Sequence, residues 1–128
     1  MDTKTTEGVK VTVTTNYLPD YSSPVQQHYV FAYKISIENN SEFTVKLLRR
    51  HWYIHDATGV VREVEGEGVV GQQPVLEPGE SHEYVSGCNL KTGMGKMRGT
   101  YLMERLVDGK KFDVTIPEFN LIVPYKLN

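Results

Sequence analysis

Cysteine is almost absent from this chain, since Cys88 is the only one among 128 residues. One cysteine cannot form an intramolecular disulfide framework, and such a chain suits a reducing compartment. No apolar run approaches the ~20 residues of a membrane-spanning helix. The first seven residues also lack the apolar core of a signal peptide. We therefore expect a soluble, cytoplasmic protein that has no membrane partner.

A basic excess is also missing. The chain has 14 Lys and Arg against 16 Asp and Glu, which gives a formal net charge of -2. Proteins that bind duplex DNA usually carry a marked basic excess, so duplex nucleic acid is not an expected partner. The length suits one domain with its own hydrophobic core. We expect a flexible polar segment at residues 1–7 and a single domain at residues 8–128.

Helical periodicity is lacking, and the dominant period is two. Val9, Val11 and Val13 alternate with polar residues, and a second alternating run covers residues 29–37. Alternation places one row of side chains on a buried face and the other in solvent. Further strands are expected at residues 44–56, 60–64, 81–86, 99–106, 112–116 and 119–123. The sequence predicts an all-β fold, an antiparallel β-sandwich of about seven to eight strands.

Irregularities in the pattern predict local features of these strands. Leu47 has one parity within its run, whereas Trp52 has the opposite parity, which predicts a bulge near Leu47 and Leu48 and a buried Trp52. Pro117 separates the last two strand segments and predicts an edge or a kink. Asp108-Gly109 predicts a hairpin turn between two alternating runs.

No catalytic grouping is visible. The chain has no Gly-x-Ser-x-Gly elbow, and Cys88 has the character of a small buried thiol. His51 and His55 would lie about 13 Å apart on a strand, too far for one metal ion. We therefore expect a protein that is not an enzyme and that needs no cofactor. The alternative for the cofactor is a bound divalent cation.

Gly66, Gly68 and Gly71 match the pattern Gly-x-Gly-x-x-Gly. The dinucleotide fingerprint needs a strand before this pattern and a helix after it, but prolines follow here without a helical period. Two interpretations remain open: a structural loop with glycines at positive φ, or a loop that binds a nucleotide, a pyrophosphate or a divalent cation.

A local basic cluster precedes this loop. Arg49, Arg50 and His51 are adjacent in sequence. They are candidates for contact with an anion or an acidic partner, and a solvated strand face is the alternative.

An acidic row leads into the loop. Glu63, Glu65 and Glu67 occupy alternate positions, so on a strand their side chains would share one face at intervals of about 7 Å. Their charge disfavours a phosphate that arrives without a metal, whereas carboxylate oxygens suit hydrated Mg²⁺ and tolerate Co²⁺. We expect negligible binding of nucleotide alone and weak binding of a divalent cation, with a solvated acidic face as the alternative.

Several separated segments together resemble one family. They are Arg49-Arg50-His51-Trp52, residues 63–74, Pro78-Gly79-Glu80, Tyr84-Val85-Ser86-Gly87, residues 95–101 and Ile116-Pro117-Glu118-Phe119. In this order they resemble the ApaG family of small bacterial proteins, also called CorD, over roughly Val9 to Pro124. The resemblance implies a fibronectin type III-like (Ig-like) β-sandwich. It also implies an association with cobalt resistance and magnesium homeostasis, without an established enzymatic activity.

The resemblance also implies protein recognition, because related domains occur in eukaryotic F-box proteins and in a DNA-polymerase-interacting protein. We therefore expect a non-catalytic ApaG-domain interaction module with a protein partner. The alternative is binding of a nucleotide, pyrophosphate or divalent cation by the Gly66-x-Gly68-x-x-Gly71 loop. Open sandwiches retain strand edges, and twofold dimers are the commonest oligomers. We therefore also expect a symmetric homodimer through a strand edge or a loop face.

Overall fold

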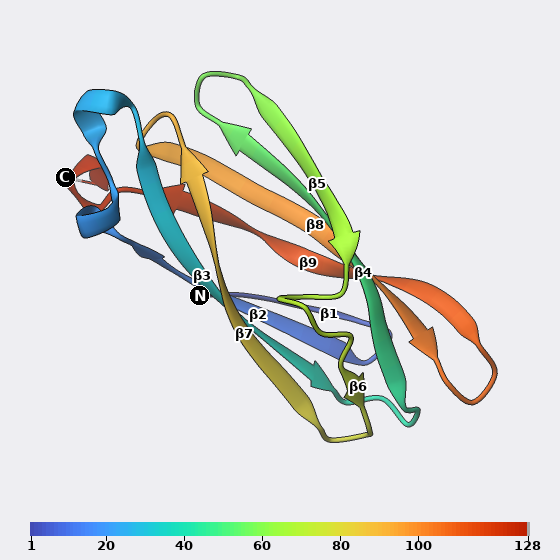
Figure 1. Cartoon of the computed structure of the whole chain (residues 1–128). Helices are drawn as coiled ribbons and strands as arrows, with labels where there is room; N and C mark the ends of the chain where they lie inside the picture. Colours follow the sequence, from blue (N-terminus) through green and yellow to red (C-terminus); the bar gives the residue numbers. More distant parts are fainter. Residues whose placement is uncertain (128) are drawn as a thin grey trace.

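The computed structural model describes residues 1–127, whose strands form two antiparallel sheets packed face to face (Figure 1). The first sheet has the order β1 (Asp2–Thr6), β2 (Val9–Tyr17), β3 (Tyr29–Asn39) and β7 (Ser81–Leu90). The second has the order β5 (Val61–Glu67), β4 (Val45–Asp56), β8 (Met94–Arg105) and β9 (Lys110–Ile122), with β6 (Val75–Leu76) beside β4. Three short 3₁₀ helices are η1 (Pro19–Tyr21), η2 (Pro24–Gln26) and η3 (Pro124–Leu127).

The predicted antiparallel β-sandwich is confirmed, with nine strands in place of seven to eight. The additional strands are β1 and the two-residue β6. None of the helices within residues 1–127 has the length and apolar character needed to cross a membrane.

The N-terminal residues differ from the expected flexible segment, because residues 2–6 form β1 and pair antiparallel with β2. Glu7 and Gly8 make the turn between the two strands, with φ of 46° and 81°, which is the conformation of a type I′ hairpin. A Cβ at Gly8 would lie 2.9 Å from Cβ of Ser41, so the close approach also requires glycine. Backbone pairing and the strand preference of threonine order this polar segment.

The core lies between the sheets and is built from the alternating residues. Val9 on β2 is fully buried, and Trp52 on β4 is 2% exposed. The Trp52 ring centroid lies 5.5 Å from that of Tyr33 and 5.9 Å from that of Phe119, both edge to face. The predicted burial of Trp52 is confirmed.

The predicted bulge lies in β4. The register with β8 shifts between Leu47 and Arg49, so Leu48 is the extra residue. A second shift between β8 and β9 lies next to Pro117, which is in the outer strand of its sheet. Proline is tolerated there because its missing N–H removes no essential ladder bond.

Contacts between the two sheets close one side of the sandwich. The Thr115 N–H of β9 donates to Oγ1 of Thr6 in β1 at 3.2 Å. The opposite side carries the two outer strands β5 and β7 (Figure 1), and Arg62 of β5 donates to the Asn89 carbonyl of β7 there.

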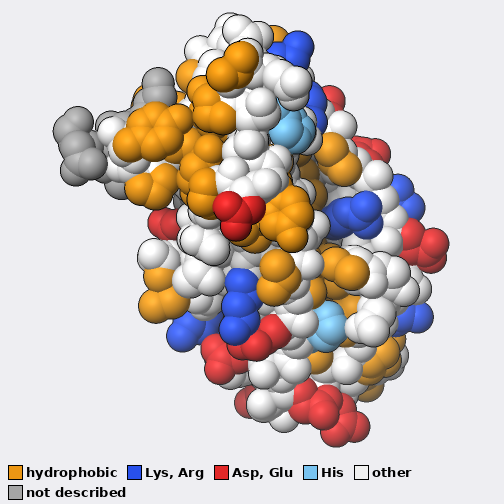
Figure 2. All heavy atoms as spheres, turned by 60° about the vertical axis from the view of Figure 1, so that its left-hand side comes forward, with side chains coloured by type: hydrophobic (Ala, Val, Ile, Leu, Met, Phe, Trp, Pro, Cys, Tyr) orange, Lys and Arg blue, Asp and Glu red, His pale blue; other side chains and the backbone are white. Residues whose placement is uncertain are grey.

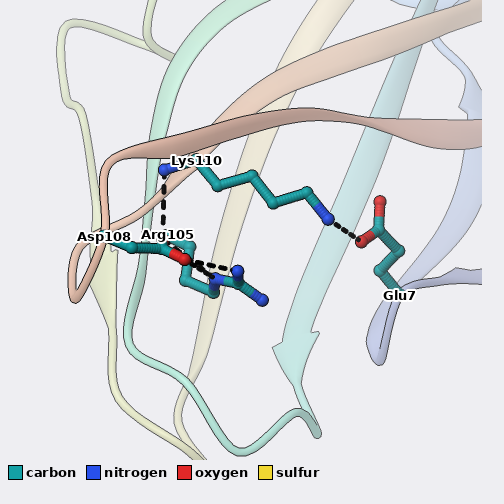
Figure 3. Close-up of polar contacts among 4 residues, drawn as sticks. All are labelled: Glu7, Arg105, Asp108 and Lys110. Carbon is teal, nitrogen blue, oxygen red and sulfur yellow. Dashed lines mark hydrogen bonds and ion pairs between the residues drawn. The ribbon is translucent and has the colours of Figure 1, made fainter.

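The β8–β9 hairpin, which Asp108-Gly109 predicted, is fixed by charged side chains (Figure 3). Asp108 accepts from Nε of Arg105 at 3.0 Å and from the Lys110 N–H at 3.1 Å, and the Lys110 ammonium lies 3.3 Å from the Glu7 carboxylate. The hydrogen bonds from Arg105 hold the pKa of Asp108 down at about 2. These contacts attach the hairpin to the turn between β1 and β2.

Candidate functional site

The glycine-rich segment after β5 forms a closed turn. Val69 and Gln72 exchange backbone hydrogen bonds of 2.8 and 3.0 Å, and Val70 and Gly71 between them have φ of 46° and 76°. These values define a type I′ turn. The N–H of Gly68 donates to a β4 carbonyl at 2.8 Å. Three of the backbone N–H groups of this loop, those of Gly68, Val69 and Gln72, are therefore already paired within the protein.

Gly68 and Gly71 have positive φ, whereas Gly66 lies close to the flexible end of Arg50. A Cβ at Gly68 would lie 2.2 Å from the Gln72 carbonyl oxygen, and one at Gly66 would lie 2.7 Å from both terminal nitrogens of Arg50. Gly71 has open space around it but a φ of 76°. The second and third glycines of the Gly-x-Gly-x-x-Gly pattern thus have a folding role in this chain.

The side chain of Arg50 in β4 holds this loop in place. Its Nη1 donates to the carbonyl oxygens of Glu67 and Gly68 at 3.1 and 3.0 Å. Arg50 lies on the inward side of β4, whereas Arg49 and His51 have the opposite parity and face outward. The structure therefore divides the basic cluster that the sequence suggested.

The bulge residue Leu48 positions the loop and was not among the predicted site residues. Its carbonyl oxygen accepts from the Gly68 N–H at 2.8 Å and from Nε2 of Gln73 at 3.0 Å. The phase slip in β4 is the sequence signal that marks it, because a bulge frees backbone groups from the ladder.

His51 lies between two glutamates of β5 on the outer face of the second sheet. Its Nε2 is 2.8 Å from Oε1 of Glu63, and its Nδ1 is 2.9 Å from Oε1 of Glu65. One nitrogen and the two carboxylate oxygens all lie within 4.8 Å of one another. Glu67 is outside this group, so the structure brings together two of the three predicted glutamates and adds His51.

Aromatic contacts hold the His51 ring in place. It stacks on Tyr53 with a centroid distance of 4.5 Å and an interplanar angle of 21°. The guanidinium of Arg98 covers the Tyr53 ring at 4.1 Å, and its Nε donates to Nε2 of His55 at 3.2 Å. Tyr53 therefore stands between the two histidines on the same strand face.

A shallow hollow of about 240 Å³ adjoins the His51 group. Residues of both charges line it, among them Arg49, Glu65 and Asp113. The mixture suits a small polar ligand or a hydrated ion better than an apolar one.

Cys88 is buried in β7, with 7% of its surface exposed. Burial raises the pKa of its thiol, and the nearby Arg62 guanidinium offsets only part of this effect. A protonated, buried thiol is a poor nucleophile, in agreement with the expected structural role.

The outer edge of β7 presents free backbone groups. Asn39 donates its N–H to the Glu80 carbonyl oxygen at 2.9 Å. In an antiparallel pair the backbone groups of every second residue bond to the neighbouring strand, so in β7 the residues from His82 to Leu90 at even positions bond to β3. The backbone groups that point away from β3 then belong to Ser81, Glu83, Val85, Gly87 and Asn89. Arg62 of β5 donates to the Asn89 carbonyl, which agrees with this assignment and occupies that end of the edge.

Comparison with known proteins gives consistent results. The family model described as "ApaG domain" matches residues 19–105. Protein ApaG of Paramagnetospirillum magneticum is 52% identical over 126 residues, which are 98% of this chain and 96% of that protein. Protein ApaG of Anaeromyxobacter dehalogenans is 51% identical over 128 residues, the full length of both. The crystal structure of a putative ApaA protein from Bordetella pertussis superposes with a TM-score of 0.88, at 49% identity over 91% of this chain and 94% of that one.

Proposed function

Because the chain belongs to the ApaG family, we propose that it is a non-catalytic binding module that recognises a protein partner through the outer edge of β7. The observation that carries the proposal is that β7, apart from the end that Arg62 occupies, lacks the protection that the other outer strands have. Unprotected strand edges pair readily with another chain, so proteins normally blunt them. The proposal places the module in the cytoplasm, where Cys88 stays reduced.

The other outer strands of the described chain are each protected, and β6 has only two residues. In β9, Pro117 lies at a bulge and the Thr115 N–H is bonded to Thr6 of β1. β1 has only five residues and carries a lysine at its centre. β5 carries three glutamates in seven residues. Proline, short length and charge are all devices that discourage pairing at an edge.

β7 differs from these strands in length and composition. It has ten residues with no proline, lysine or arginine, and over its described length its register with β3 has no shift. Among the residues of β7 whose backbone groups point away from β3, which we call the outward row, Glu83 is the one charged residue. Val85 at the centre of this row is 59% exposed. An extended segment of a partner would bond to the free backbone groups and contact alternate side chains, as in other cases of strand addition.

The edge is tested by comparing Val85→Pro with Val85→Ala. The Val85 N–H points away from β3, so proline removes a donor for the partner without removing a ladder bond. Peptides of about seven residues, the length of an ordinary strand, are selected from a random displayed library against the full chain. We expect Val85→Pro to abolish their binding and Val85→Ala to retain it, with thermal unfolding as the fold control. Peptides that bind the folded Val85→Pro variant as well as the parent would contradict the proposal.

The second candidate function is a role linked to divalent cations, in cobalt resistance and magnesium homeostasis. The observation that favours it is the group of His51, Glu63 and Glu65. One ring nitrogen would bind an ion together with one glutamate, while the other nitrogen donates its proton to the second glutamate. Metal-bound histidines commonly have such a carboxylate partner. An imidazole ligand favours Co²⁺ over Mg²⁺, which prefers oxygen ligands and water.

The cation site is tested by Co²⁺ titration followed by NMR, because Co²⁺ is paramagnetic and affects nearby signals. We expect perturbation centred on His51, lost in His51→Asn and Glu63→Gln, and retained in Glu67→Gln. Glu67 is the matched control because it lies on the same strand but outside the group. Equal weakening by both glutamate variants would show general acidic attraction in place of a site.

The nucleotide alternative has less support from the geometry. The loop N–H groups of Gly68, Val69 and Gln72 are paired, and Arg50 is bonded to loop carbonyls. We therefore expect no measurable heat when ATP without metal is titrated into the protein.

A further inference from the structure

The edge of β7 is complementary to itself. We propose that two copies of the chain associate through their β7 strands, antiparallel about a twofold axis at Val85, so that the first sheets of both copies become continuous. The inference rests on the proposed function, because it uses the same edge, and it commits that edge to a second copy as occupant.

The twofold axis at Val85 fixes which residues face each other. Val85 faces its own equivalent, and Glu83 faces Gly87 of the second copy on both sides of the axis. These residues belong to the outward row of β7, so each facing pair can exchange backbone hydrogen bonds. Farther out, Ser81 would face Asn89, whose carbonyl already accepts from Arg62, so the central pairs carry the association.

Charge and space both favour this register. The Glu83 carboxylate lies 3.5 Å from Nζ of Lys34 in the same sheet, and it would meet no like charge across the axis. Gly87 has no side chain, which leaves room for the glutamate that faces it. Val85 is 59% exposed and would bury part of that surface against its equivalent, a gain that the monomer does not have.

The same operation is unfavourable at the other edges. A twofold axis at Val64 of β5 would place Glu63 opposite Glu65 on both sides, and like charges directly opposite destabilise a strand pair. An axis at the centre of β1 would place Lys4 against itself. In β9, Thr115 is already bonded to β1. Self-pairing is therefore specific to β7.

The test is sedimentation equilibrium of the full chain with charges introduced at Gly87. This position accepts a side chain, because a Cβ there would meet only the Phe31 carbonyl oxygen at 3.5 Å and the φ is not in the positive range. Gly87→Glu creates two repulsive pairs with Glu83, and Gly87→Lys creates two attractive pairs. From the usual energies of cross-strand pairs, we expect the dissociation constant to rise roughly two- to thirty-fold in the first variant and to fall by a similar factor in the second.

Two further variants make the outcome decisive. Glu83→Lys combined with Gly87→Glu restores opposite charges and should return the dissociation constant toward that of the parent. Val85→Pro removes the central hydrogen bonds and should give a monomer, while circular dichroism confirms its fold. A dimer whose dissociation constant does not change with these substitutions would overturn the assignment to β7.

A parent that stays monomeric up to about 1 mM, the limit of weak specific association, would overturn self-pairing. The proposed function is separable from this result. If the parent is monomeric and selected peptides still bind it but not Val85→Pro, strand addition stands and only the second copy as occupant is excluded.

Discussion

Val70 occupies a backbone conformation that its side chain disfavours. It has φ of 46° at the first central position of the turn between Val69 and Gln72. A positive φ costs an ordinary residue about 1–2 kcal/mol, and it is least tolerated by β-branched residues. The Val70 side chain is 63% exposed, so burial offsets little of this cost. Asparagine tolerates the conformation, and Asn-Gly is the favoured pair for this turn.

We therefore expect Val70→Asn to raise the free energy of unfolding by about 1 kcal/mol. For a domain of this size the unfolding midpoint should rise by roughly 3–6 °C. Val70→Gly should raise the free energy of unfolding by less. Glycine gives the unfolded chain more conformational freedom, which costs about 0.4–1 kcal/mol of stability. Urea denaturation and calorimetry measure both values. The matched control is Val60→Asn, since Val60 is 52% exposed but is not among the residues with positive φ.

A fall in the midpoint of Val70→Asn would contradict this prediction, because it would mean that contacts of the valine outweigh its strain. An equal rise in Val60→Asn would refute it as well, because the gain would then come from replacing any exposed valine.

Three other predictions concern the core, the hairpin and the loop. Trp52→Ala should cost about 3–5 kcal/mol in urea denaturation, because a large buried side chain is removed; stability equal to the parent would show that Trp52 is not buried. The pKa of Asp108 is lowered from 3.8 to about 2 by its hydrogen bonds from Arg105, so its stabilisation is complete above pH 4 and is lost as the pH falls through 2. The stability difference between parent and Asp108→Asn should therefore shrink over that range, and a difference independent of pH would contradict the assignment. Gly68→Ala should destabilise more than Gly66→Ala, because its Cβ meets backbone at 2.2 Å whereas the Cβ at Gly66 meets a flexible arginine; the reverse order of unfolding midpoints would contradict the close approach.

Most of the fold follows from local patterns in the sequence. Alternation marks the long strands, and the phase slip before Trp52 locates the bulge at Leu48. The first strand is missed because its residues are polar and its turn is Glu7-Gly8 in place of the more familiar Asn-Gly. The two-residue β6 is missed because so short a segment has no period.

The candidate sites depend on pairing that one sequence does not reveal. Alternation places Glu63 and Glu65 on one face, but His51 joins them only because β4 and β5 pair in one particular register. That register also places Arg50 opposite Gly66, so an arginine expected at the surface is bonded to the loop. Likewise, β7 can be identified as an unprotected edge only when the order of both sheets is known.

Exposed apolar residues also lie outside β7. Tyr21, Val25 and Tyr125 are all exposed, and hydrophobic side chains also gather near the C-terminus in Figure 2. They lie on short 3₁₀ helices, which offer no free row of strand backbone groups. Strand addition therefore points to β7 and not to this end of the molecule.

Amide hydrogen exchange measures directly whether the outer edge of β7 is the recognition surface. The outward N–H groups of Glu83, Val85 and Gly87 are compared with the inward ones of Tyr84 and Ser86, which bond to β3. In dilute protein the outward amides should exchange fast and the inward amides slowly. On addition of a selected peptide, or on concentrating the protein, we expect the outward amides to become protected while the inward ones change little. Outward amides that continue to exchange fast while an independent titration shows the peptide bound would contradict the claim.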